Sequence, residues 1–366
     1  MENNIELISS LGKIIVFLML LFSAFLFSVK GNKRLPNQIF ATFLLITAFD
    51  LTGLFLIDGS AKYLNFQILK SASSLLQMPA FYLYVLSVCY SDFTLKPKHL
   101  LHTGLFFLFL LILKINSYSN QSLLILRIVG EVQYFAYIVA IFFALKKYKT
   151  IYLENYSNPD YTNYKWLFQA TVIFCIAHVF VLVKLGAHYF HNDQHLLQYI
   201  YILISISALS VICWFVLKAL YSPYLFTGVR AALKPIKSTT DKYKTTAEKD
   251  IASNEAIKRL TFYMENEKPY LDFELTLQKL ASQFGMQEKE LSILINQYLG
   301  KHFFDFINEY RIEEAKRILG NPHNEALTIL EILYQVGFNS KSSFYTAFKK
   351  ETNQTPTSYR KSALSG

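Results

Sequence analysis

Seven long apolar stretches separated by short polar connections fill most of the first 220 residues. A helix of about 20 apolar residues crosses the hydrocarbon core of a bilayer, and each stretch is close to that length. The third stretch begins with a serine-rich turn and the fourth is short, so a count one higher or lower stays open. The stretches are residues 11–29, 37–57, 71–90, 99–115, 122–145, 164–186 and 196–220. The pattern predicts a seven-helix transmembrane bundle over residues 1–221.

Lysine and arginine in the connections predict the orientation of this bundle. The connections after the first, third and fifth stretches carry nine of these residues, against four in the other connections. Positive residues collect on the cytoplasmic side of a membrane. The N-terminus is therefore expected outside, and everything after residue 221 in the cytoplasm. The four on the predicted outer side are Lys62, Lys70, Lys114 and Lys184.

Five polar residues interrupt the apolar stretches at a similar depth in the predicted outer half: Asp50, Gln77, Arg127, Glu131 and His178. Ionisable groups inside a membrane are costly, which makes them candidates for function. Arg127 and Glu131 are four residues apart, on one helix face, and can pair. Two interpretations remain open: a structural cluster that locks helices together, or a site that senses a ligand or protons.

The last predicted outer connection contains three imidazoles and a carboxylate, His188, His191, Asp193 and His195. These groups can bind Zn²⁺ or respond to acidity, but their spacing fits no closed structural zinc site. Histidine at a membrane interface is the plainer interpretation. We therefore predict no bound metal and no cofactor, and keep these residues as the metal candidates.

The remaining third of the chain has helical periodicity and almost no strand signal. Residues 222–252 are basic and punctuated by Pro223 and Pro235, as in a linker. In 253–366, two units each consist of a helix, a glycine turn at Gly285 or Gly337, and a second helix. One amphipathic helix, 303–319, joins them. This layout can present two recognition helices about 34 Å apart, one turn of B-DNA. The predicted fold class is therefore all-α, a membrane bundle followed by a cytoplasmic helical domain.

Residues 251–363 resemble the AraC-type DNA-binding domain along nearly its whole length. The segments that carry the resemblance are 275–281 (LTLQKLA), 299–304 (LGKHFF), 310–315 (YRIEEA), 336–340 (VGFNS), 343–349 (SFYTAFK) and 355–360 (TPTSYR). The resemblance implies binding to double-stranded DNA by two helix-turn-helix units. It implies DNA contacts from Lys289, Ser292, Ile293 and Asn296 in the first unit, and from Lys341, Ser342, Tyr345, Thr346, Lys349 and Arg360 in the second.

The chain departs from the family pattern at three positions. Ile293 stands where the family often has a long polar residue, so we expect the first unit to specify few bases. Leu333 replaces a small alanine, whereas Ala281 keeps it in the first unit. Asn353 stands where glycine is common, and asparagine tolerates the left-handed conformation. Phe344 and Phe348, at i,i+4 spacing, are expected in the core.

Composition supports a chain divided between two solvents. Hydrophobic residues make up 53% and charged residues 17%, against about 25% charged in soluble domains. Residues 1–217 hold 24 charged side chains, whereas the much shorter 251–366 holds 28, with 14 of each sign. A single soluble globule, a disulfide scaffold and a disordered chain are thereby excluded. The balanced charge predicts weak non-specific DNA binding, for which dimerisation, tethering or a basic face must compensate.

We find no sequence pattern typical of nucleotide binding, zinc proteases or serine hydrolases, so an enzyme is not expected. The leading interpretation is a membrane-embedded one-component transcription regulator in a bacterial cytoplasmic membrane. Its signal would be a small molecule, an ion or a membrane protein, and it could act as a homodimer. The alternative is a receptor or transporter whose helical tail is an interaction module. Substrate flux without a sequence-selective DNA footprint would favour that alternative.

Overall fold

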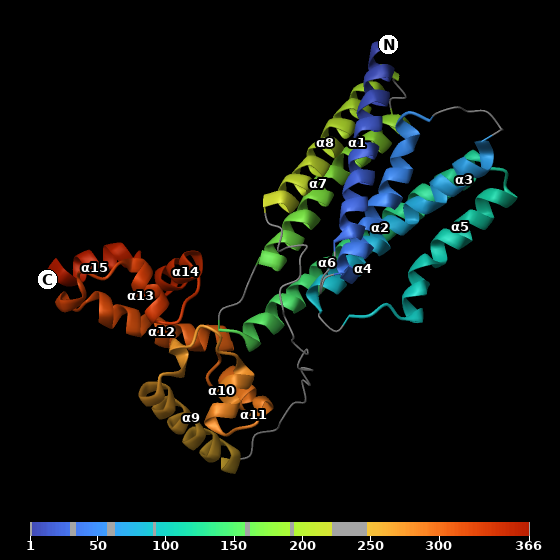
Figure 1. Cartoon of the computed structure of the whole chain (residues 1–366). Helices are drawn as coiled ribbons and strands as arrows, with labels where there is room; N and C mark the ends of the chain where they lie inside the picture. Colours follow the sequence, from blue (N-terminus) through green and yellow to red (C-terminus); the bar gives the residue numbers. More distant parts are fainter. Residues whose placement is uncertain are drawn as a thin grey trace. The chain divides into compact units, whose positions relative to one another are not determined.

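The computed structural model is all-α in the residues that it describes, as the periodicity predicted (Figure 1). These residues are 2–29, 34–56, 63–90, 93–157, 162–190, 194–221 and 247–365. Most of the predicted linker, 222–246, lies outside them. The chain forms two compact units. The first comprises Met1–Tyr148 with Tyr161–Pro235, and the second comprises Lys149–Asp160 with Ile236–Gly366.

The first unit contains seven segments that are long and apolar enough to cross a membrane, which confirms the predicted number. The third segment is interrupted by the 3-10 turn Ser74–Leu76, where the sequence has its serine-rich stretch. The helices are α1 (Glu2–Ser28), α2 (Arg34–Leu51), α3 (Leu64–Ser73), α4 (Gln77–Cys89), α5 (Gly104–Ile115), α6 (Asn120–Asn155), α7 (Thr162–Phe190) and α8 (Gln194–Tyr221).

Buried aromatic rings hold the interior of this unit together. Helix α1 packs against α2 and α8, so the first and last spans lie side by side (Figure 1). Phe40, Phe81 and Phe215 are fully buried between α2, α4 and α8. The indole N–H of Trp166 on α7 donates to the Tyr84 hydroxyl at 2.9 Å, so a buried donor and acceptor satisfy each other.

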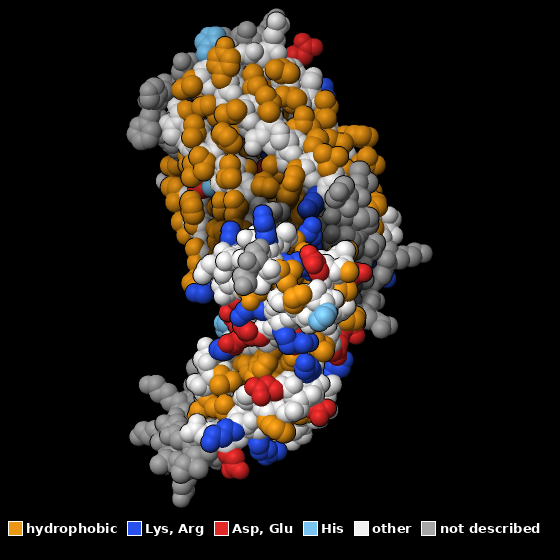
Figure 2. Space-filling view, turned by 90° about the vertical axis from the view of Figure 1, so that its left-hand side faces the viewer, with side chains coloured by type: hydrophobic (Ala, Val, Ile, Leu, Met, Phe, Trp, Pro, Cys, Tyr) orange, Lys and Arg blue, Asp and Glu red, His pale blue; other side chains and the backbone are white. Residues whose placement is uncertain are grey.

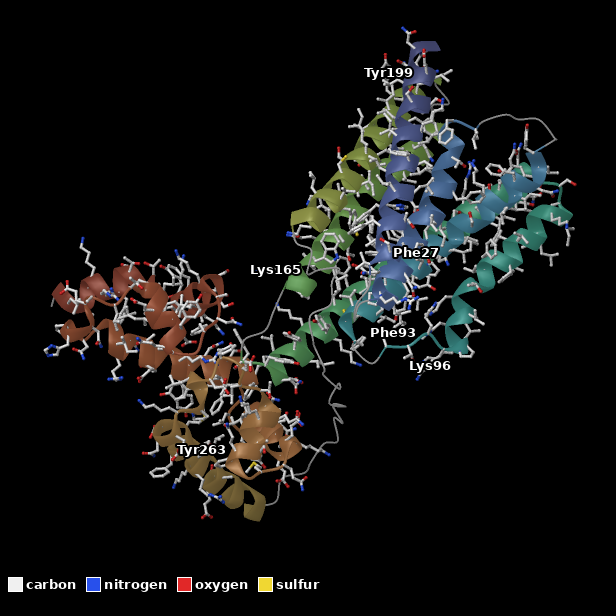
Figure 3. All side chains as sticks on the ribbon, viewed as in Figure 1. Phe27, Phe93, Lys96, Lys165, Tyr199 and Tyr263 are labelled. Carbon is white, nitrogen blue, oxygen red and sulfur yellow. The ribbon has the colours of Figure 1, made fainter. Side chains whose placement is uncertain are left out.

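The outer surface of the first unit is apolar. Figure 2 shows hydrophobic side chains covering the face of the seven helices that is in view. Figure 3 places Lys96 and Lys165 at one end of the unit and Tyr199 at the other. Both lysines belong to connections that the charge distribution assigns to the cytoplasmic side. Their common end is consistent with that prediction of orientation.

The second unit is built around one long helix, α12 (Phe303–Leu319). Its N-terminal half supplies Phe303, Phe306 and Ile307 to one hydrophobic core, and its C-terminal half contributes to a second core. Each core belongs to one helix-turn-helix unit, so α12 fixes one unit relative to the other. The other helices are α9 (Ala247–Glu267), α10 (Leu277–Phe284), α11 (Glu288–Ile293), α13 (Ile329–Gln335), α14 (Lys341–Thr352) and α15 (Pro356–Ser365).

The two glycine turns that the sequence predicted adopt the left-handed conformation, with φ of +71° at Gly285 and +87° at Gly337. Asn353 ends α14 with φ of +58°. The surroundings of the two glycines differ. A Cβ on Gly285 would meet nothing within 4 Å, whereas one on Gly337 would lie 2.5 Å from the Tyr270 carbonyl oxygen. The second turn is therefore packed against the loop that precedes the first unit.

We predict that Gly337→Ala destabilises the second compact unit, which contains α12, more than Gly285→Ala does. Both substitutions place a side chain at positive φ, which costs about 1–2 kcal/mol. Only Gly337→Ala adds a clash with buried backbone, and overpacking typically costs about 1–3 kcal/mol more. Hydrogen exchange of the α12 amides in the purified full-length chain measures the difference. Equal protection in the two variants would contradict the close packing of the second turn.

Candidate nucleic-acid interface

The first helix-turn-helix unit presents a short second helix. The side chain of Thr276 caps α10 by accepting a hydrogen bond from the Lys279 N–H at 3.1 Å. Helix α11 ends at Ile293, where the chain continues as a π-turn over Leu294–Tyr298. The sequence pattern predicted a second helix in this unit but not the π-turn. Buried Leu294 and Ile295 face the core at this point and anchor the turn.

The four residues predicted to contact DNA from this unit have different exposure. Lys289 is exposed, while Ser292, Ile293 and Asn296 are half-buried. The side-chain N–H of Asn296 donates to the Ser292 hydroxyl at 3.2 Å, which orients both groups on one face. Two carboxylates, Glu288 and Glu290, flank Lys289 in the first turn. They stabilise the helix N-terminus but repel a phosphate.

The second helix-turn-helix unit has stronger caps and a longer second helix. Thr328 and Glu331 form a capping box at the start of α13. The Ser340 hydroxyl caps α14 by accepting from the Ser343 N–H at 3.2 Å. These caps satisfy backbone N–H groups that would otherwise lack partners at the helix starts. The first turn of α14 is therefore held in a defined position.

Helix α14 has a sharply divided surface. Phe344, Ala347 and Phe348 are buried, as the spacing of the two phenylalanines predicted. The opposite face exposes polar and basic side chains from the predicted set, namely Lys341, Ser342, Thr346 and Lys349, beside the half-buried Tyr345. The Lys341 ammonium lies 5.5 Å from the centre of the Tyr345 ring, a distance at which the ring holds the cation.

Two basic residues near this face are less available. Lys350 forms an ion pair with Asp305 at 2.7 Å and ties α14 to the start of α12, so its charge is already neutralised. Arg360 on α15, also in the predicted set, is half-buried. The exposed positive charge of the second helix-turn-helix unit therefore comes mainly from Lys341, Lys349 and Lys361.

Arg311, to which the sequence analysis gave no role, lies fully buried at the middle of α12. Its Nε–H donates to the Tyr270 carbonyl at 2.7 Å, and an Nη2–H donates to the Asp272 carbonyl at 2.8 Å. Its guanidinium also lies 5.5 Å from the centre of the Phe338 ring, next to the second glycine turn. Burial lowers the pKa of Arg311 to about 9, and the Asp272 carboxylate opposes that shift. Arg311 thus links the two helix-turn-helix units.

The polar residues predicted in the membrane part form two separate pairs. The Gln77 amide donates to the Asp50 carboxylate at 3.2 Å, and His178 Nε2 lies 2.7 Å from the Glu131 carboxylate. The His178 ring stacks on Tyr134, with centroids 3.6 Å apart. Glu131 therefore pairs with His178. The pairing with Arg127 that their spacing allows is not formed in the described structure, where Arg127 is exposed.

Two lysines of the predicted outer connections interact with these pairs. Lys184 interacts electrostatically with Asp50, Arg127 and Glu131. Lys70 interacts with Asp50, and its ammonium lies directly over Gly53, where a Cβ would collide with it. Both lysines lie inside long helical segments. The ends of the apolar stretches in the sequence do not show how far these helices extend.

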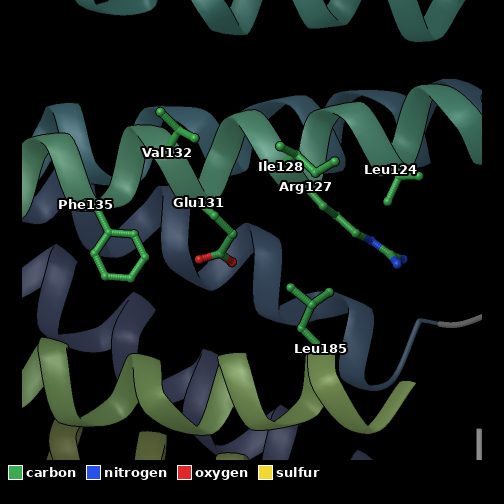
Figure 4. Close-up of a pocket in the computed structure, with 7 residues that line it drawn as sticks. All are labelled: Leu124, Arg127, Ile128, Glu131, Val132, Phe135 and Leu185. Carbon is green, nitrogen blue, oxygen red and sulfur yellow. The ribbon is translucent and has the colours of Figure 1, made fainter. Parts of the chain in front are cut away.

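A groove of about 330 Å³ opens beside the Glu131 and His178 pair. Figure 4 shows Arg127 and Glu131 of α6 extending toward α7, from which Leu185 projects into the same space. The surface that lines the groove is apolar, although Arg127 and Glu131 are among the residues around it. Its lining residues are Leu124, Arg127, Ile128, Glu131, Val132, Phe135 and Leu185.

The metal candidates in the last predicted outer connection are mostly outside the described part of the chain. His191 and Asp193 lie outside it, and the side chain of His188 is likewise not described. His195 is exposed at the start of α8. The described residues contain no group of three or more metal-binding side chains.

Residues 280–362 match a protein family described as a helix-turn-helix domain. An uncharacterized HTH-type transcriptional regulator of Staphylococcus aureus (strain COL) is 40% identical over 87 residues, which are 24% of this chain and 11% of that protein. The uncharacterized HTH-type transcriptional regulator YdeC of Bacillus subtilis (strain 168) is 32% identical over 88 residues, 24% of this chain and 29% of that protein. No solved structure shows a significant match.

The matched region coincides with the two glycine turns, the helix α12 and the polar face of α14. The chain spans less than a third of the length of these relatives, and the match stops short of the seven-helix unit. The C-terminal part of the chain is therefore a helix-turn-helix domain of the AraC type, joined to an N-terminal part with seven helices able to cross a membrane.

Proposed function

We propose that the chain is a membrane-embedded one-component transcription regulator whose binding to specific DNA sequences is controlled by a signal in the seven-helix unit. The observation that carries this proposal is the division of α14, whose buried aromatic face leaves a capped polar and basic face exposed. A helix of this kind fits the major groove. Seven apolar helices with internal ionisable pairs in the same chain supply a sensor.

In this proposal the second helix-turn-helix unit makes most of the contacts that recognise the DNA sequence. Lys341, Ser342, Tyr345 and Thr346 contact base edges, and Lys349 and Arg360 contact phosphates. The first unit positions the protein through Lys289, Ser292, Ile293 and Asn296. It recognises fewer bases because Ile293 is apolar. The glutamates beside Lys289 also weaken the contact of this unit with phosphates. A homodimer would double these contacts and compensate for the balanced charge of the domain.

The signal acts in the seven-helix unit. The Asp50–Gln77 pair and the Glu131–His178 pair each join two helices through a hydrogen bond to a carboxylate, and such bonds change strength when a proton or ligand arrives. The apolar groove beside Glu131 fits an apolar molecule or lipid chain. The protein lies in the bacterial cytoplasmic membrane, with its N-terminus outside and its C-terminal domain on the side where DNA is.

We predict that the full-length chain in nanodiscs enriches one motif from randomised DNA duplexes. Lys341→Ala should reduce affinity for that motif by about 1–3 kcal/mol and relax specificity at one position. Lys258→Ala, an exposed lysine on α9, is the matched control and should keep the motif. If the full-length chain selects no motif, the receptor or transporter alternative replaces this proposal.

We predict that Glu131→Gln changes the output of the regulator while leaving it folded in the membrane. The substitution keeps the shape of the side chain and removes the charge that faces His178. Output from a reporter driven by the selected motif should change about fivefold or more, the size of a typical allosteric coupling. Glu6→Gln, the same change at an exposed position of α1, should leave the output unaltered. Loss of membrane-inserted protein in Glu131→Gln alone would show that the pair is structural.

A further inference from the structure

The compact unit that contains the helix-turn-helix domain also contains a piece of the membrane domain. Lys149–Asp160 belongs to this unit, although it connects the fifth and sixth apolar segments. Helix α6 runs unbroken from Asn120 to Asn155, so its last turns form part of the second unit. We call residues 149–157 the strap.

The strap ends in a residue that is completely buried in the second unit. Ser157 has no exposed surface. Its hydroxyl donates to the Leu275 carbonyl at 2.7 Å, and its own N–H reaches the same carbonyl at 3.3 Å. The preceding residue, Tyr156, forms an isolated antiparallel bridge with Thr276, the cap of α10. The strap therefore attaches to the segment that starts the first helix-turn-helix unit.

Ser157 also completes the surroundings of Arg311. An Nη1–H donates to the Ser157 carbonyl at 3.3 Å, and an Nη2–H donates to the Ser157 hydroxyl at 3.1 Å. Of the four hydrogen bonds that the guanidinium makes in the described structure, the strap receives two. A buried cation needs its donors satisfied, and removing a partner leaves an uncompensated charge. The arrangement of Arg311 therefore depends on a residue 154 positions away.

The bonds of Ser157 hold the domain together and do not cover a recognition helix. They go to Leu275, before α10, and to Arg311, in the middle of α12. Arg311 in turn contacts Tyr270 and Asp272 on one side and Phe338 on the other. A docked strap therefore favours one fixed arrangement of the two helix-turn-helix units. Its release leaves part of the guanidinium unsatisfied, so that arrangement loosens.

We propose that the strap is the regulatory element through which the seven-helix unit controls DNA binding. The docked strap is the binding-competent state, and its withdrawal from Arg311 lowers DNA affinity. The control reaches the strap through α6, because the same helix carries Arg127 and Glu131 of the groove and ends two residues before Ser157. This proposal rests on the proposed function and adds the route of the signal.

The first test compares two lysine substitutions in the full-length chain in nanodiscs. Ser157→Lys puts a positive charge and a long side chain into the buried site beside Arg311 and should expel the strap. Thr150→Lys makes the same change at an exposed position of the strap. Ser157→Lys should weaken binding to the selected motif fivefold or more, and Thr150→Lys should leave it within twofold of the parent. Equal affinities for the two variants would overturn the proposal.

The second test reports docking without DNA. In a full-length background with the native cysteines replaced by alanine, Ser157→Cys should react with a water-soluble maleimide at least tenfold more slowly than Thr150→Cys. Equal rates would show that the strap is not docked and would overturn the proposal whatever the DNA measurement gives. Protection of Ser157→Cys combined with no DNA binding by the parent chain would instead locate the failure in the proposed function.

A third variant keeps the proposal testable if Ser157→Lys does not fold. Tyr156→Cys with Thr276→Cys, in the same background, places two thiols at the bridge and allows the strap to be locked by oxidation. With Glu131→Gln added, the effect of that substitution on DNA affinity should disappear on oxidation and return on reduction. If the Glu131→Gln effect persists with the strap locked, the signal takes another route.

Discussion

The compact unit that contains both helix-turn-helix units depends on a buried guanidinium. Arg311 lies at the point of α12 where the core of the first helix-turn-helix unit gives way to the core of the second. A planar group with five N–H donors needs acceptors around one plane, and here these come from two separated parts of the chain, the loop at Tyr270 and Asp272 and the strap at Ser157. The Phe338 ring, beside the second glycine turn, adds a cation–π contact with the guanidinium. The angle between the two helix-turn-helix units is therefore set by the packing of α12 together with this one side chain.

The seven-helix unit follows the same rule in a different solvent. In apolar surroundings an unpaired carboxylate has a high free-energy cost. Asp50 and Glu131 are each paired with a polar side chain of another helix. Hydrogen bonds of this kind are strong in a low-dielectric interior and sensitive to any change in charge. Lys184 on α7 interacts electrostatically with the carboxylates of both pairs. Glu131 on α6 is joined to α7 by its contact with His178.

Much of this fold was predictable because its signals are local. The 3.6-residue period predicted α12 at 303–319, and the two glycines predicted the positions of the two turns. Local patterns did not predict the π-turn after Ile293, which buried Leu294 and Ile295 stabilise through tertiary packing.

The candidate sites were less accessible from the sequence. The His178 partner of Glu131 comes from another helix, so the i,i+4 spacing pointed to Arg127 instead. Ser157 is one serine in a polar connection and carries no pattern of its own. Its role follows only from a contact across 154 positions. The residues that read DNA stay predictions, because only their exposure and the polar face of α14 are on view.

The location of the strap is effective because of how two-site DNA binding works. In the proposed function both recognition helices engage DNA at once, and linking two modules raises the affinity well above that of either module alone. The domain carries 14 charges of each sign, so a net positive field does not hold it on DNA when one unit lets go. In the mechanism that we propose, a small change in the angle between the two helix-turn-helix units lowers the affinity for DNA, although neither recognition helix is altered or covered. Release of Ser157 from Arg311 would act on that angle, so the middle of α12 would control both recognition helices together.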